Sequence, residues 1–254
     1  MDQSTQKKIS SFTTTLQKID NFSDEFLLEI KKIVDDHKVN GGHLEYVYVQ
    51  HFQKEIVGLS NLFQYLLKDD KNQKYTFFAV RGSFEVLLYL EYVLRLKDED
   101  DNKILELFSK DMAQSASALN DAIPTDKDHL MNKTIGKIAI VNKILETDFN
   151  LEKIKSNTRP FPDIRSLCNK SSLKIKDSAG SDMYHLYSMY SESNHLRLGS
   201  QHAITEDISI LTLFAIEYFL EIYIKFYQLL LDTNIYSDEY RNKLNEIKTS
   251  IGLN

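Results

Sequence analysis

Residues 208–231 read ISILTLFAIEYFLEIYIKFYQLLL, an almost wholly apolar stretch with the length of a core helix. From residue 217 onward its polar side chains fall three or four residues apart and so form one stripe on a helix. They are Glu217, Glu221, Lys225, Gln228 and, just beyond the stretch, Asp232. Two carboxylates in the middle of a membrane span are costly in lipid. The pattern therefore favours a core helix with one paired or wetted stripe, and we expect no membrane partner.

The composition favours the same helical class. Among 254 residues there are only three prolines and eight glycines, which suits long uninterrupted helices better than turn-rich β structure. We predict an all-α fold, a multi-helix bundle with additional helices at both ends, as a single domain over 1–254. A flexible N-terminus is expected at 1–20, a core at about 43–232 and a crossing loop at 148–177.

The periodicity of apolar residues predicts the helices. Ser23 has the residue type of a helix cap and precedes the first of them. The expected helices span about 24–40, 43–67, 74–97, 103–120, 126–147, 163–170, 182–198, 206–231 and 237–250.

The cysteine and histidine content restricts the chemistry. Cys168 is the single cysteine, which excludes an internal disulfide and is read as a small buried residue. The first residues carry no apolar run of a secretory signal, so a cytoplasmic location is expected. The seven histidines are scattered without metal-ligand spacing, and no glycine-rich phosphate loop is present. We therefore expect neither a metal nor a cofactor.

A basic segment lies at 153–176, where seven cations accompany the single acidic residue Asp163 in a chain whose net charge is −6. Such a segment can bind the phosphates of RNA, or it can be an ordinary solvated loop, and its composition leaves both readings open. Its candidate RNA-binding residues are Lys153, Lys155, Arg159, Arg165, Lys170, Lys174 and Lys176.

Two polar motifs stand out against apolar surroundings. Arg81 and Glu85 are four residues apart in an apolar helix, so we expect them to share a face and pair. Tyr187, Ser191 and His195 repeat every fourth residue, which places a phenol, a hydroxyl and an imidazole along one stripe. This set suits general acid–base catalysis, but it also suits a hydrogen-bonded network that only stabilises the fold.

Together these motifs resemble a bacterial helical family catalogued as domain of unknown function 5677. The resemblance covers about 75–227 and rests on Arg81-x3-Glu85, on residues 161–168 (FPDIRSLC), and on Tyr187-x3-Ser191-x3-His195. That family resembles in turn the HEPN superfamily (higher eukaryotes and prokaryotes nucleotide-binding). The superfamily includes dimeric, metal-independent RNases of toxin and antiviral systems. The resemblance implies a HEPN-like core, a homodimer and activity on RNA.

The HEPN hallmark is an Arg, often followed by Asn, with a His five residues after the Arg. If His195 is that His, Tyr190 stands in the place of the Arg and Ser191 in the place of the Asn. The resemblance then implies that Arg81 supplies the missing cation from a neighbouring helix and that His195 transfers a proton.

A literal match to the hallmark, Arg197-x4-His202, is the secondary candidate, although Gly199 and Ser200 interrupt its helix. Two functions follow from these motifs. One is a metal-independent ribonuclease, as a toxin or antiphage effector. The other is a non-catalytic helical module that binds a nucleotide, RNA or a protein regulator in the same polar pocket.

Overall fold

The computed structural model describes residues 3–39, 45–69, 71–100, 103–108, 110–111, 139, 160–176, 178–194, 208–233 and 238–250. Its elements are α1 (Gln3–Val39), α2 (Glu45–Leu67), the 3-10 turn η1 (Gln73–Tyr75), α3 (Thr76–Glu99), α7 (Ile164–Lys170), α8 (Gly180–Asn194), α10 (Ile208–Asp232) and α11 (Asp238–Ser250). Within these ranges every regular element is helical, apart from an isolated bridge between Ile175 and Ser178. The predicted all-α fold is confirmed.

The chain divides into two compact units, where the sequence predicted a single domain. The first unit contains 1–32, 49–92 and 164–254, and the second contains 33–48 and 93–163. Helices α1, α2 and α3 each contribute residues to both. The two polar motifs of the sequence both fall in the first unit.

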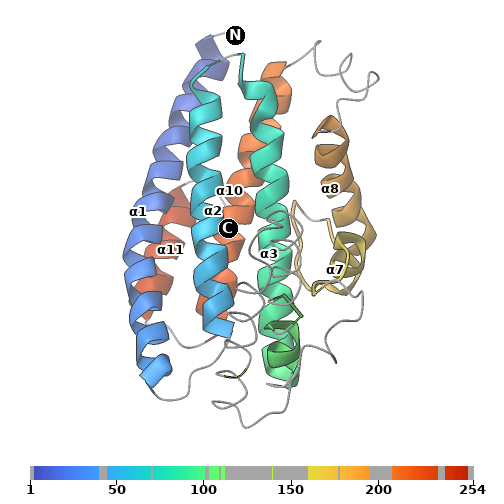
Figure 1. The fold of residues 1–254 in the computed structure, drawn as a ribbon. Coiled ribbons are helices and arrows are strands. Elements are labelled where there is room, and N and C mark those ends of the chain that lie inside the picture. The colour runs from blue at the N-terminus through green and yellow to red at the C-terminus, as the bar shows by residue number, and fades with distance from the viewer. Residues whose placement is uncertain are drawn as a thin grey trace, which may run out of the picture. The chain divides into compact units, whose positions relative to one another are not determined.

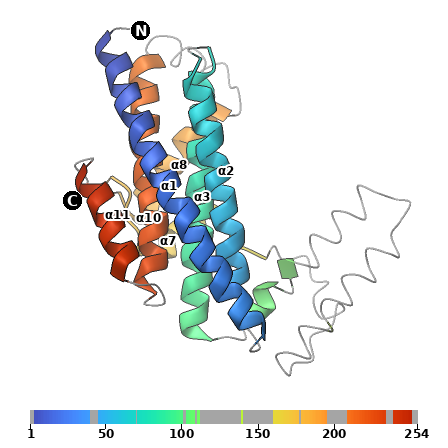
Figure 2. The same ribbon diagram turned by 90° about the vertical axis from the view of Figure 1, so that its left-hand side faces the viewer.

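The core of the first unit is rich in aromatic side chains because α10 carries them at helical spacing. Phe219, Phe226 and Tyr227 are fully buried. Phe219 stacks on Phe63 of α2 with ring centroids 4.5 Å apart, and Tyr227 meets the ring of Phe26 of α1 edge-on. Figure 2 shows α11 beside α10, against which it packs. None of the described helices combines the length and hydropathy that crossing a membrane requires.

Helix α1 corrects the prediction for the N-terminal region. The predicted flexible segment 1–20 and the helix start at Ser23 are wrong, because one helix runs from Gln3 to Val39. Leu16 and Ile19 are fully buried on it. The hydroxyl groups of Thr13, Thr14 and Thr15 bond to carbonyl groups four residues earlier. These bonds keep β-branched polar residues inside a helix, where the sequence pattern favours a loop.

Ser23 shows why the cap was misread. Its side chain is fully buried in the middle of α1, and its hydroxyl hydrogen-bonds to the hydroxyl of Tyr227. The other predicted helices are confirmed within a few residues as α2, α3, α7, α8, α10 and α11. The predicted helix 103–120 is helical at 103–108 and 110–111, and 126–147 lies outside the described residues except for residue 139.

The polar stripe of α10 is paired, as the sequence predicted. Glu217 accepts a hydrogen bond from the Lys176 ammonium at 3.0 Å, and Glu221 accepts the backbone N–H of Lys176 at 2.9 Å. Glu221 also lies 3.8 Å from the ammonium of Lys225. Lys176 has a φ of 48°, a left-handed conformation that these two glutamates hold in place. The stripe therefore fastens the turn before α8 to the core.

Candidate functional site

The candidate site lies between α3 and α8, which pack side by side in the first unit (Figure 1). Phe77 of α3 meets Tyr190 of α8 with ring centroids 5.5 Å apart, and Phe84 meets Tyr187 at 5.9 Å. The later residue of α3 therefore contacts the earlier residue of α8, as in an antiparallel pair. These two ring contacts set the register of α3 against α8, and so determine which polar side chains of the two helices face each other.

Arg81, Glu85 and Tyr187 form a closed triad of hydrogen bonds. The Nε–H of Arg81 donates to Oε1 of Glu85 at 3.0 Å and to the hydroxyl oxygen of Tyr187 at 3.2 Å. The hydroxyl of Tyr187 donates to the same Glu85 oxygen at 2.6 Å. The guanidinium carbon also lies 5.6 Å from the centroid of the Tyr187 ring. The predicted Arg81–Glu85 pair is confirmed, and the triad brings together two motifs that are about a hundred residues apart in sequence.

The environment fixes the protonation state of the triad. Burial, which is the largest effect, and the carboxylate of Glu85 together raise the pKa of Tyr187 to about 12, against the opposing effect of Arg81. Burial alone lowers the pKa of Arg81, but its bonds to Tyr187 and Glu85 outweigh burial and leave that pKa raised. Near neutral pH the site therefore holds a permanent cation beside a neutral phenol.

One edge of the Arg81 guanidinium remains available to a ligand. The side chains of Arg81 and Glu85 are 31% and 28% exposed, so solvent reaches both. Only Nε of the guanidinium is engaged, since neither terminal nitrogen donates a hydrogen bond within the described part of the chain. A guanidinium fixed at Nε with both Nη groups open has the geometry for two parallel hydrogen bonds to a phosphate or carboxylate.

The other predicted catalytic residues are not placed at this site. The backbone of Ser191 belongs to α8, but its side chain is not described, and His195, Arg197 and His202 lie outside the described residues. Helix α8 ends at Asn194, which is about 10 Å farther along the helix axis than Tyr187. The meeting of His195 with Arg81 stays a prediction.

The cations of the basic segment 153–176 have different surroundings. Lys153, Lys155 and Arg159 lie outside the described residues, and the charge of Lys176 is paired with Glu217. Arg165 is exposed and lies over the ring of Tyr184, with its guanidinium carbon 5.8 Å from the ring centroid. Lys170 and Lys174 are also exposed. Arg165 therefore contacts α8 through the ring of Tyr184.

A second polar cluster was not identified from the sequence. Asp20 of α1 accepts hydrogen bonds from Ser60 at 2.8 Å, from Tyr223 at 3.0 Å and from the amide of Gln64. One turn farther along α1, the carbonyl of Ser23 accepts the amide of Gln53 at 3.1 Å. We call these residues, together with Tyr227, the polar layer. The only sequence signal was isolated polar residues on the apolar faces of α1 and α2, which do not reveal their partners.

Glu91 and Cys168 are buried residues that serve the fold. Glu91 of α3 accepts both the backbone N–H and the hydroxyl of Ser172, at 2.7 and 2.9 Å, which anchors the segment after α7. Cys168 is fully buried, as predicted. Burial, which is the largest effect, and the nearby Glu91 raise the pKa of its thiol to about 11, against the lowering effect of a backbone hydrogen bond. The thiol is therefore protonated at neutral pH and unsuited to nucleophilic catalysis.

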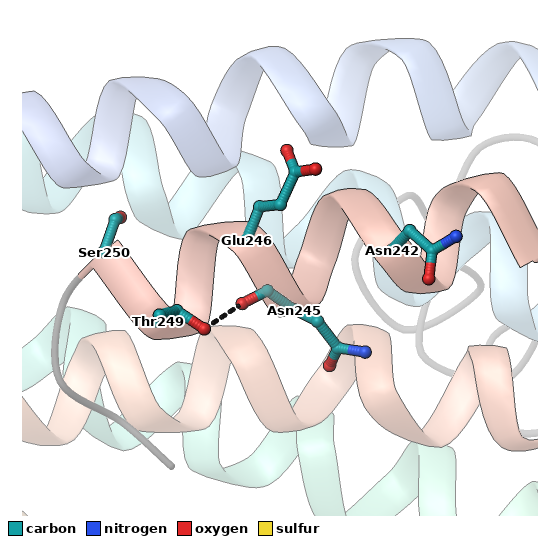
Figure 3. A pocket seen from close by; sticks show the side chains of 5 residues that line it. All are labelled: Asn242, Asn245, Glu246, Thr249 and Ser250. Carbon is teal, nitrogen blue, oxygen red and sulfur yellow. Dashed lines mark hydrogen bonds between the residues drawn. The ribbon is translucent and has the colours of Figure 1, made fainter.

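An open hollow of about 620 Å³ lies on α11, apart from the triad. Its lining residues are Asn242, Asn245, Glu246, Thr249 and Ser250. Figure 3 shows that these side chains come from a single helix and that the hydroxyl of Thr249 bonds to the carbonyl of Asn245. Glu246 is the one charged group among these five residues. A carboxylate without a neighbouring cation in that lining does not favour a phosphate ligand.

Neither a metal-binding cluster among the described residues nor a similarity to known proteins identifies a function for this site. In the ranges that the structure describes, no group of three or more His, Cys, Asp or Glu side chains is arranged to hold a metal ion. Comparison of the chain with protein family models, with curated proteins and with solved structures found no match.

Proposed function

We propose that the chain binds RNA at the Arg81 triad and cleaves it without a metal ion, as a HEPN-like ribonuclease. The observation that carries the proposal is the open edge of the Arg81 guanidinium, held in place by Glu85 and Tyr187 on a surface that solvent reaches. The resemblance of the sequence motifs to HEPN proteins supports RNA as the ligand. It also supports a homodimer that acts as a toxin or antiphage effector, and we place this activity in the cytoplasm because the sequence carries no apolar run of a secretory signal.

In the proposed reaction, the two Nη groups of Arg81 bind the non-bridging oxygens of one phosphodiester. The ribose 2′-hydroxyl attacks the phosphorus, the bond from phosphorus to the 5′-oxygen breaks, and a cyclic phosphate remains on the upstream fragment. Arg81 stabilises the negative charge that develops on the phosphoryl oxygens. His195 accepts the proton of the attacking hydroxyl or donates one to the leaving oxygen. Glu85 and Tyr187 hold the guanidinium in position.

A second candidate is a non-catalytic module that binds RNA, a nucleotide or a protein regulator in the same place. The state of the triad favours it: Arg81 is paired with Glu85, and the pKa of Tyr187 is about 12. Neither the Arg81 guanidinium nor the Tyr187 phenol exchanges a proton near neutral pH. Catalysis therefore depends on His195 or another group that lies outside the triad, and the two candidates differ in that dependence.

The test measures cleavage and binding of labelled RNA by the wild type, by Arg81→Ala and by His195→Ala, with chelator present throughout. We expect each substitution to slow cleavage by about a hundredfold or more, because each removes a group that acts on the reacting phosphate. Lys18→Ala is the matched control, since it removes an exposed cation of α1 that lies outside the basic segment and should leave cleavage unchanged.

Melting temperatures accompany the measurement. If both variants cleave at the wild-type rate, the ribonuclease proposal is wrong. RNA binding that depends on Arg81, with no cleavage by any form, selects the non-catalytic module. If activity falls only in proportion to folded protein, the triad is a structural network.

A further inference from the structure

Arg165 and Tyr184 form a contact next to the triad that stability does not require. Arg165 of α7 is exposed, and its guanidinium lies over the half-buried ring of Tyr184 on α8. No carboxylate pairs with Arg165 among the described residues, whereas Lys176 of the same basic segment is paired with Glu217. An exposed cation over a phenol ring contributes little to folding, because water competes for both groups.

Tyr184 connects this contact to the triad. Its ring stacks on that of Tyr187, with centroids 6.1 Å apart and ring planes at 28°, and Tyr187 in turn bonds to Arg81. The contacts run from Arg165 of α7 through the rings of Tyr184 and Tyr187 of α8 to Arg81 of α3. We call these four side chains the row. Because α7 packs against α8, the row is fixed by packed helices.

The chemistry of the row matches one class of ligand. Single-stranded nucleic acid is bound by cations that meet its phosphates and by flat groups, aromatic rings or guanidinium planes, on which unpaired bases stack. The bases of a duplex are already stacked on one another and cannot enter between Arg165 and Tyr184. A carboxylate ligand or a bare phosphate would use Arg81 but would leave Tyr184 and Arg165 without a role.

We infer that Arg165 and Tyr184 form a second subsite, which holds an unpaired base next to the phosphate bound at Arg81. The inference rests on the proposed function and narrows its substrate class to single-stranded RNA. The exposed Arg165 side chain moves to admit the base, which then stacks between the guanidinium and the phenol ring. Arg165 and Tyr184 are thereby binding residues that touch the substrate, and they take no part in proton transfer.

The experiment uses the full chain and a short labelled 2′-O-methyl oligoribonucleotide, which cannot be cleaved, as a single strand and as a closed duplex. We expect Tyr184→Leu to weaken single-strand binding about tenfold or more, the typical loss for a base-stacking ring. Tyr184→Phe keeps the ring and should bind like the wild type. Arg165→Gln should weaken single-strand binding about threefold or more, because it removes the guanidinium plane that covers the other face of the base.

Lys18→Gln is the control for Arg165→Gln, because it removes an exposed cation of α1, outside the basic segment, with no described aromatic contact. Its affinity for the single strand should stay close to that of the wild type. The inference is overturned if Arg81→Ala weakens binding while Tyr184→Leu and Arg165→Gln do not, and the proposed function then survives. It is also overturned if Tyr184→Leu weakens duplex binding equally. If the folded wild type binds neither form, the proposed function fails together with the subsite.

Discussion

Tyr187 is the residue on which the triad depends. It is only 9% exposed, and its hydroxyl both accepts from Arg81 and donates to Glu85. The Arg81–Glu85 pair on its own is a partly exposed ion pair of one helix, a type of contact that is worth a few tenths of a kcal/mol. Tyr187 turns that local pair into a contact between α3 and α8.

Tyr187→Phe should lower the free energy of unfolding by about 1.5 kcal/mol at neutral pH, because it removes two hydrogen bonds to charged groups and leaves the ring in place. Tyr65→Phe is the control, since Tyr65 is 63% exposed and its substitution should stay within about 0.5 kcal/mol. Urea unfolding measures both. A Tyr187→Phe protein as stable as the Tyr65→Phe protein would show that the triad contributes nothing to folding.

The same residue predicts a pH dependence. The pKa of Tyr187 rises from 10.0 to about 12 in the folded chain, so the folded state holds the phenolic proton more tightly than the unfolded state. The resulting stabilisation is fully present below pH 10 and is lost as pH rises through about 12. The stability difference between the wild type and Tyr187→Phe should therefore be constant up to pH 10 and shrink above it. A difference that grows above pH 10 would contradict the assignment.

At the residue scale, the sequence predicts local partners and misses distant ones. Arg81 and Glu85 were predicted as a pair because helical spacing alone brings residues four apart together. Tyr187 was singled out by its spacing to Ser191, but nothing in that spacing identifies Arg81 as its partner. Ser23 was misread for the same reason, because its partner Tyr227 is about two hundred residues away.

At the scale of elements, two glycines of similar appearance in sequence have different surroundings. Gly58 of α2 is exposed, and an added Cβ would meet nothing within 4 Å. A Cβ added to Gly82 of α3 would lie 2.9 Å from Cδ2 of Leu59. Gly82 of α3 therefore packs tightly against a leucine side chain of α2, one residue away from Arg81.

Gly58→Ala should stabilise the chain by about 0.5–1 kcal/mol, because alanine is the better helix former. Gly82→Ala has the same propensity gain, but Leu59 must move to admit the methyl group, so we expect a net loss of about 1 kcal/mol. In a Leu59→Ala background the obstacle is absent, and Gly82→Ala should then be stabilising. Urea unfolding of the wild type, of the single variants Gly82→Ala and Leu59→Ala and of their double variant gives the coupling energy. Equal effects of Gly82→Ala in both backgrounds would contradict the close packing.

The elements themselves were largely predictable, with one informative failure. Apolar residues at helical spacing predicted α2, α3 and α8, and an almost wholly apolar stretch predicted α10. Apolar spacing failed at the start of α1, where Ser and Thr residues dominate between Ile9 and Leu16. There the helix depends on burial of a few apolar side chains against other helices, and on hydroxyl groups that bond back to the helix's own carbonyls.

At the scale of the whole molecule, the polar layer determines how α1, α2 and α10 fit together in the first unit. The carboxylate of Asp20 accepts from two side chains of α2 and from Tyr223 of α10. Ser60 and Tyr223 are fully buried, so their hydroxyl groups have no access to water if Asp20 is removed. Burial, together with the nearby Tyr227 and Asp20, keeps the pKa of Tyr223 well above its usual value. A shift of α1 by one turn would leave these donors unpaired. The polar layer therefore fixes the register of α1 against α2 and α10.

Asp20→Leu should therefore lower the free energy of unfolding by about 3 kcal/mol, because it leaves buried donors on α2 and α10 without an acceptor. Asp20→Asn should cost only about 1 kcal/mol, since its amide oxygen still accepts from Ser60 and Tyr223 while the amide of Gln64 turns over. Asp24→Leu is the matched control on the same helix, because Asp24 is exposed and its substitution should stay within about 0.5 kcal/mol. Equilibrium urea unfolding ranks the three variants. If Asp20→Leu proved as stable as Asp24→Leu, the carboxylate would not be what fixes the position of α1, and apolar burial of Leu16 and Ile19 would be left to do so alone.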